Sequence, residues 1–131
     1  MIILDTQAWL WWTHDLSRLS SEVIKTIKVA EKSDGIRVSV ISAWEIALKS
    51  NLGKLALPLQ INEWVHQASS YPNLSIELLS VQDAIESTQL PGDFHKDPAD
   101  RIIVAMTRRH NATLVTSDKL ILAYPHVKTI W

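Results

Sequence analysis

The chain has 131 residues, of which 47% are hydrophobic and 21% charged, with a formal net charge of −1 at pH 7. This composition predicts one globular domain, residues 1–131, and excludes a low-complexity or disordered chain. The near-neutral charge argues against a protein that coats nucleic acid, and the absence of cysteine excludes disulfides, thiol catalysis and zinc–thiolate sites. With no signal peptide and no apolar run near the roughly 18 residues of a membrane span, we expect a soluble, cytoplasmic protein with no membrane partner.

The first half of the chain alternates short apolar runs with amphipathic segments. Apolar residues at helical spacing predict helices, and short β-branched runs predict strands. In chain order we expect a strand at 2–4, a helix at 6–12, a helix that is capped by Ser20 or Ser21 and ends at Asp34-Gly35, a strand at 37–40 and a helix to about Leu52.

The second half continues the alternation. In chain order we expect a helix at 61–68, a strand at 75–79, a helix opened by the capping box Ser80-Val81-Gln82-Asp83, a loop at 90–96, a helix at 98–110, a strand at 112–116, a helical turn at 119–123 and a strand at 127–130. Strands separated by helices predict an α/β fold with a small, mostly parallel, helix-covered sheet.

Acidic residues stand near the predicted helix starts at four widely separated points. Asp5 follows the first strand, Glu45 comes after the second, Asp100 opens the long helix and Asp118 follows the fourth strand. The carboxyl ends of parallel strands meet at one edge, so these side chains should share a crevice. Clustered carboxylates repel one another unless protons or cations intervene, and oxygen ligands suit Mg²⁺ or Mn²⁺. The pattern therefore predicts a divalent-metal site.

Each acid also has a purely structural explanation. Ser42 and Glu45 match a capping box, and Asp97 followed by Pro98 is a typical helix start. Because Ser, Thr or Asn would cap equally well, the repeated use of acids at one predicted edge favours the metal site. The spacing alone leaves Ca²⁺ binding and phosphomonoester chemistry open.

The chain resembles PIN-domain ribonucleases, and above all the toxins of VapBC-type toxin–antitoxin pairs. The motifs that carry the resemblance occur in order along the whole chain: Asp5-Thr6-Gln7-Ala8, Ser42-Ala43-Trp44-Glu45-Ile46-Ala47, Leu52-Gly53-Lys54-Leu55, the block from His95 to Ala105, and Thr116-Ser117-Asp118. The resemblance implies about five parallel strands with helices on both faces, and Mg²⁺- or Mn²⁺-dependent hydrolysis of RNA. It also implies an antitoxin partner and a two-fold homodimer.

Motif by motif, the resemblance implies catalytic and metal-binding roles for Asp5, Glu45, Asp100 and Asp118. Supporting roles fall to neighbouring polar residues, namely Asp97, Thr6, Thr116 and Ser117. Arg101 is a candidate for an RNA contact. Five further basic residues could line an RNA path or could equally be solvated helix residues: Lys49, Lys54, Lys96, Arg108 and Arg109. Arg101 has an alternative partner in a nearby carboxylate, which we favour. Two other functions stay open, a metal-dependent phosphomonoesterase and an inactive PIN-like scaffold that binds RNA or protein.

Two further features qualify this interpretation. Related proteins often carry a bulky aromatic residue where this chain has Ala99, which we expect to alter packing beneath the site. Trp9, Trp11 and Trp12 cannot all face one core, so at least one should be exposed or meet a partner. Burial under a neighbouring helix is the alternative. His95 precedes the acidic motif and has two explanations, a contact with substrate or an ordinary surface position in the loop, of which we favour the second.

Overall fold

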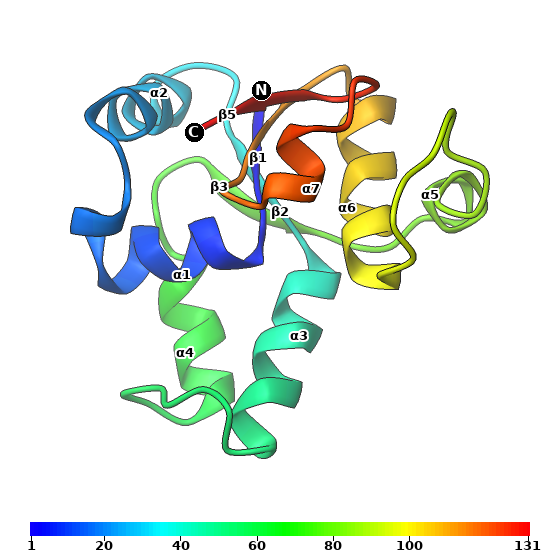
Figure 1. Cartoon of the computed structure of the whole chain (residues 1–131). Helices are drawn as coiled ribbons and strands as arrows, with labels where there is room; N and C mark the ends of the chain where they lie inside the picture. The colour runs from blue at the N-terminus through cyan, green and yellow to red at the C-terminus, as the bar shows by residue number, and fades with distance from the viewer.

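Five short strands form one sheet in the computed structural model, which describes residues 1–131 (Figure 1). The strands are β1 (Ile2–Leu4), β2 (Ile36–Ser39), β3 (Leu74–Glu77), β4 (Thr113–Val115) and β5 (Lys128–Ile130). Their order is β3-β2-β1-β4-β5, and every neighbouring pair is parallel. The predicted parallel sheet is confirmed, with β1 at its centre.

Helices connect successive strands, as parallel pairing requires. They are α1 (Thr6–His14), α2 (Ser21–Glu31), α3 (Val40–Asn51), α4 (Ile61–Ala68), α5 (Val81–Glu86), α6 (Pro98–Arg109) and α7 (Lys119–Leu122), with a 3₁₀ turn at Leu16–Arg18. The helices and strands expected from the sequence are all present, with small differences at their ends. No helix combines the length and apolar character needed to cross a membrane.

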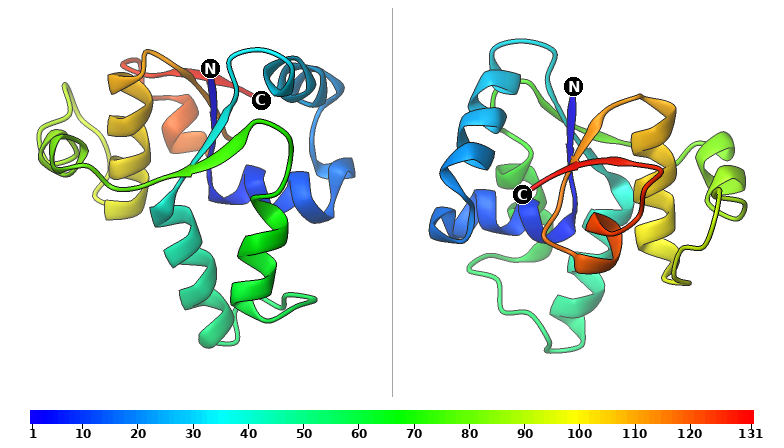
Figure 2. Two further views of the ribbon diagram at one scale, coloured as in Figure 1. Left: turned by 180° about the vertical axis from the view of Figure 1, so that it is seen from behind. Right: turned by 45° about the horizontal axis from the view of Figure 1, so that its top comes forward.

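Side chains of the strands point alternately into two hydrophobic cores. Ile2 and Leu4 belong to the core beneath α1, α2 and α4, whereas Ile3 between them belongs to the core beneath α6. β4 continues the alternation, because Leu114 pairs with Ile3 and Val115 pairs with Leu4. Figure 2 shows α1 and α2 on one side of the sheet and α5 and α6 on the other. The expected cover of helices on both faces is confirmed.

The three tryptophans of α1 lie on more than one side of the helix, and each side packs against another part of the protein. Trp9 is fully buried, with its ring centroid 5.0 Å from that of Trp64 on α4, and Trp12 is also buried. Trp11 is half-buried against Trp131 near the chain end, with centroids 5.4 Å apart. Neighbouring segments therefore cover more than one side of α1. None of the three is exposed: Trp9 is buried under α4 and Trp12 is buried beside Tyr71. A partner contact of half-buried Trp11 stays a prediction.

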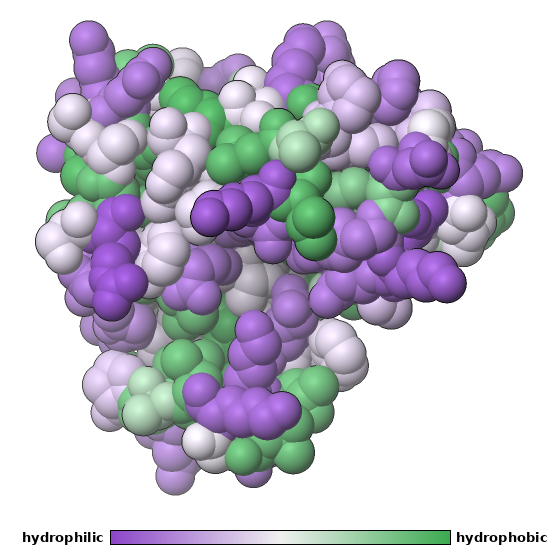
Figure 3. Space-filling view, viewed as in Figure 1, coloured by the Kyte–Doolittle hydropathy of each residue, from purple (hydrophilic) through white to green (hydrophobic).

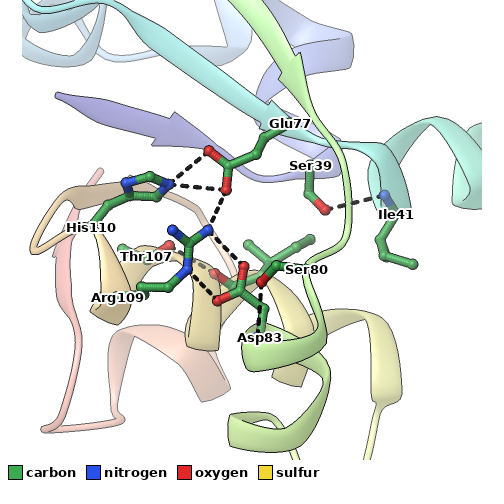
Figure 4. Close-up of polar contacts among 9 residues, drawn as sticks. Ser39, Ile41, Glu77, Ser80, Asp83, Thr107, Arg109 and His110 are labelled. Atoms are coloured by element: carbon green, nitrogen blue, oxygen red, sulfur yellow. Dashed lines mark hydrogen bonds and ion pairs between the residues drawn. The ribbon is translucent and has the colours of Figure 1, made fainter.

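A cluster of ion pairs and hydrogen bonds links the end of α6 to α5 and β3 (Figure 4). The Arg109 guanidinium donates to both oxygens of buried Asp83, from Nε at 2.7 Å and Nη2 at 2.9 Å, and to Glu77 Oε2 at 2.6 Å. His110 Nε2 lies 2.7 Å from Glu77 Oε1. Burial alone would raise the pKa of Asp83, but its hydrogen bonds from Arg109 and Ser80 hold that pKa below its usual value.

This cluster corrects two expectations about sequence motifs. Ser80 caps α5 by accepting from the Asp83 backbone N–H at 3.0 Å, but the Ser80 backbone N–H does not donate to the Asp83 carboxylate, whose two oxygens accept from Arg109. Only half of the predicted capping box forms. Arg109, considered either an RNA contact or a solvated residue, instead forms ion pairs within the protein.

Candidate active site

The central strands deliver two acids to one edge of the sheet. Asp5 directly follows β1, and Asp118 follows β4 after two intervening residues. β1 and β4 are paired in register, and the Asp5 backbone N–H donates to the Val115 carbonyl at 3.1 Å. Asp5 is buried, and Asp118 is half-buried. Sheet topology alone therefore brings together two residues that are far apart in sequence.

Glu45 reaches the same edge from α3. This helix begins at Val40 directly after β2, and its cap is Ser39, whose hydroxyl accepts from the Ile41 N–H at 3.1 Å. Ser42 and Glu45 thus lie inside the helix, and the capping-box explanation of Glu45 is wrong. The Thr6 hydroxyl instead donates to Glu45 Oε1 at 2.6 Å.

Three of the acids do cap helices. Asp5 Oδ1 accepts from the Ala8 N–H at 2.8 Å at the start of α1, and Asp97 Oδ1 accepts from the Asp100 N–H at 3.1 Å at the start of α6. Asp118 Oδ1 accepts from two N–H groups of α7 at 2.9 and 3.1 Å. Capping and membership of an acidic site are therefore compatible, since each carboxylate has a second oxygen.

The four predicted acids line one pocket of about 190 Å³. Asp100, in the first turn of α6, completes the group. None of the lining residues is hydrophobic: they are Asp5, Thr6, Gln7, Glu45, Lys49, Asp100, Ser117 and Asp118. The structure thus places Thr6, Ser117 and Lys49 beside the acids. Asp97 lies in a neighbouring groove, with Trp44 and Pro98.

Burial and mutual repulsion perturb two of these carboxyls. Burial raises the pKa of Asp5 to about 6, with smaller contributions from the charges of Asp118 and Glu45, while hydrogen bonding by Thr116 acts in the opposite direction. Burial also raises the pKa of Asp100 to about 7, together with repulsion from the other nearby acids. The carboxylates are thus held close together at an energetic cost that a bound cation would relieve.

The remaining candidates have different surroundings. Buried Thr116 accepts from the Asp118 N–H at 3.0 Å and so supports the turn that carries this acid. Lys96 is exposed and does not line the acidic pocket. Arg101 contacts neither the pocket nor a carboxylate, because its guanidinium donates to the backbone carbonyls of Ser87, Phe94 and His95. The expected carboxylate partner of Arg101 is therefore wrong.

Two residues beside the acids were not predicted from the sequence. Gln7 lines the pocket, and its position next to Thr6 in the first motif was the available signal. His95, expected to be an ordinary loop residue, has its Nε2 atom 3.1 Å from Asp100 Oδ2. Its place in the same short motif as Asp97 and Asp100 could have indicated this contact.

The donor set fits a hard divalent cation. Four carboxylates at one pocket supply oxygen ligands, and the raised pKa values of Asp5 and Asp100 show that unneutralised charge is costly there. Mg²⁺ and Mn²⁺ take carboxylate ligands and retain coordinated water. Asp5, Glu45, Asp100 and Asp118 are the residues that could hold such an ion.

The fold and the pocket together define a class of small α/β proteins with an acidic cleft at the carboxyl edge of a parallel sheet. The chain belongs to the PIN-domain family, whose characteristic domain matches residues 2–126. It is 28% identical to Ribonuclease VapC22 of Mycobacterium tuberculosis over 134 aligned residues, which cover 99% of this chain and 98% of the relative.

Solved structures of toxin–antitoxin proteins share the fold. The chain is similar to a chain of VapBC2 from Rickettsia felis bound to promoter DNA, with a TM-score of 0.71, 18% identity, and coverage of 99% of this chain and 98% of the other. It is also similar to DNA-bound VapBC from Salmonella typhimurium, with a TM-score of 0.70, 15% identity and coverage of 98% and 96%.

Proposed function

We propose that this chain is a divalent-metal-dependent endoribonuclease that hydrolyses RNA phosphodiester bonds and acts as the toxin of a toxin–antitoxin pair. The observation that carries the proposal is the convergence of Asp5, Glu45, Asp100 and Asp118 on a pocket without hydrophobic lining. Whole-length similarity to a relative named as a ribonuclease supports the same chemistry. Action on cellular RNA would place the protein in the cytoplasm.

In this proposal the four acids hold Mg²⁺ or Mn²⁺. When bound, such an ion activates water as a nucleophile and stabilises charge on phosphate oxygens. Thr6 orients the Glu45 carboxylate through its 2.6 Å hydrogen bond, and Thr116 fixes the turn that carries Asp118. No side chain forms a covalent intermediate.

Basic residues near the pocket would receive the RNA backbone. Lys49 lines the pocket directly, and Lys96 is exposed in the loop before α6. Both are proposed to neutralise phosphates. Arg101 is not included, because it does not line the pocket and its Nε and Nη1 groups donate to three backbone carbonyls. We assign Arg101 a structural role, which is to hold the loop between α5 and α6.

We propose that an antitoxin inhibits the enzyme through the groove beside α1. This groove is lined by Gln7, Leu10, Trp11, His14 and residues 55–58, and most of these are hydrophobic. Gln7 lines both this groove and the acidic pocket. An apolar peptide in the groove could therefore extend a basic side chain to the acids. The similar structures named as VapBC complexes support such a partner.

We also propose a homodimer that uses the exposed face of α3. Trp44, Leu48 and Leu52 are 57%, 40% and 59% exposed at helical spacing. Figure 3 shows hydrophobic surface at the lower end of the molecule, where α3 and α4 project. Apolar residues gathered in this way favour a protein contact. Because Glu45 belongs to the same helix, association through this face would bring two acidic pockets near each other.

The proposed activity is tested by incubating RNA with the protein and Mg²⁺, with chelator, and with the Asp5→Asn variant. Asp15→Asn, a change in an acid outside the pocket, is the matched control. We expect cleavage only by wild type and the control, and only with the metal. Cleavage that survives both chelator and Asp5→Asn contradicts the proposal. Hydrolysis of p-nitrophenyl phosphate without RNA cleavage would indicate a phosphomonoesterase, and RNA binding without cleavage an inactive scaffold.

A further inference from the structure

His95 lies against the acidic pocket but is not one of its four acids. We propose that His95 Nε2 is a metal ligand that, with Asp100 and Asp118, forms a mixed nitrogen–oxygen position at this site. Such a position favours Mn²⁺ and related transition-metal ions over Mg²⁺. This inference rests on the proposed function only in requiring that the acidic pocket binds a divalent cation.

The first support is the geometry of the three side chains. One donor atom from each of His95, Asp100 and Asp118 lies within 4.8 Å of the other two. His95 Nε2 and Asp100 Oδ2 are 3.1 Å apart, which matches the separation of about 3 Å between adjacent ligands of one octahedral ion with bonds of about 2.1 Å. The two side chains are thus spaced as neighbouring ligands.

The second support is the state of the imidazole nitrogen. His95 Nε2 is shielded from solvent but has no hydrogen-bond partner, since its contact with Asp100 lacks hydrogen-bond alignment. A buried polar atom without a partner is costly and calls for an explanation. Coordination of a cation in the adjoining pocket gives this nitrogen a partner.

The third support is the way the loop before α6 is held. Arg101 Nη1 donates to the carbonyls of Phe94 and His95 at 3.0 and 3.1 Å, so the residue after Asp100 fixes the backbone of His95. The Phe94 ring packs between the imidazole and Tyr124, with centroids 4.4 and 4.6 Å from them. His95 is thereby fixed relative to Asp100, as a metal ligand should be.

The chemistry of the ligands determines which ion benefits. Carboxylates serve Mg²⁺ and Mn²⁺ alike, whereas an imidazole nitrogen is a better ligand for transition-metal ions than for Mg²⁺. Removing His95 should therefore weaken Mn²⁺ binding while leaving Mg²⁺ binding nearly unchanged. A purely structural role for His95, as an ion-pair partner of Asp100, gives no such difference between the two ions.

The direct test is electron spin-echo spectroscopy of the Mn²⁺-loaded wild-type protein. A coordinated imidazole produces ¹⁴N modulation from a directly bound nitrogen, and we expect this signal. The His95→Gln variant should lose it, and the surface variant His66→Gln should retain it. In calorimetric titrations, His95→Gln should raise the Kd for Mn²⁺ by about tenfold or more and the Kd for Mg²⁺ by less than about threefold.

The outcomes separate this inference from the proposed function. Mn²⁺ that binds without ¹⁴N coupling overturns the role of His95 and leaves metal-dependent cleavage intact. Equal losses of Mn²⁺ and Mg²⁺ affinity in His95→Gln indicate a structural role and also overturn it. If neither ion binds the wild-type protein, both proposals fail. The wild-type spectrum decides the matter even if His95→Gln does not fold.

Discussion

Replacing Asp5 by Asn should stabilise the metal-free protein at neutral pH. Asp5 has a folded-state pKa of about 6, raised from 3.8 chiefly by burial. The folded protein therefore binds this proton more tightly than the unfolded chain does. The resulting stability is fully present below pH 4 and is lost as the pH rises through 6. The Asn side chain still has an oxygen that can accept from the Ala8 N–H, but it carries no charge.

The shift of about two pKa units corresponds to about 3 kcal/mol as an upper limit. For a chain of this length, 3 kcal/mol corresponds to roughly 10 °C in Tm. We therefore expect Asp5→Asn in EDTA to melt up to about 10 °C above wild type at pH 7.5. The difference should nearly vanish at pH 4. Thermal unfolding monitored by circular dichroism at both pH values measures it.

Two comparisons separate charge relief from capping. Asp5→Ala removes both the charge and the cap, so it should be about 1 kcal/mol less stable than Asp5→Asn. Saturating Mg²⁺ should stabilise wild type by about 3 kcal/mol at a hundred times its Kd and should have a smaller effect on Asp5→Asn. If Asp5→Asn melts below wild type at pH 7.5, or its advantage persists at pH 4, the electrostatic argument is refuted.

Four other outcomes follow from the described contacts. Asp5→Asn, Glu45→Gln, Asp100→Asn and Asp118→Asn should each abolish RNA cleavage without unfolding the protein, and a variant with near-wild-type rate would remove that acid from the site. Arg109→Met should cost about 3 kcal/mol in chemical denaturation, because buried Asp83 loses its partner, while cleavage at low temperature persists; an unchanged midpoint would contradict this. Trp11→Ala should weaken antitoxin binding about tenfold in calorimetry, and equal affinity would show that the antitoxin binds outside the groove beside α1. Trp44→Ala should lower the dimer fraction in light scattering, and a wild-type protein that is monomeric at micromolar concentration would exclude the dimer.

The sequence predicted the features that depend on local pattern and on general rules of topology. Short apolar runs and helical periodicity located the strands and helices, and parallel order placed Asp5 and Asp118 at one edge. The rule that parallel strands share a carboxyl edge was enough to group acids from opposite ends of the chain. Local pattern did not show whether an acid caps a helix or belongs to the site, because Asp5 and Asp118 do both.

Features that depend on contacts between distant side chains were not predicted. Arg101 donates to carbonyls of the loop before α6, and neither helical nor strand periodicity predicts the path of that loop. The contact between His95 and Asp100 depends on the same loop conformation. The hydrogen bond from Arg109 to Asp83 likewise depends on the packing of α5 against α6. The sequence gives the faces of these helices, but the partners of long charged side chains depend on the assembled tertiary structure.

The spread of the site over the fold has a consequence for how the molecule opens. Asp5 and Asp118 directly precede α1 and α7, Glu45 lies within α3, and Asp100 lies in the first turn of α6. A cation held by all four would act as a cross-link that closes long chain loops. Local opening of any one of these segments would then require release of the ion. Amide exchange in α1, α3 and α6 should slow together on metal loading, and a chelator would make the domain more susceptible to proteases.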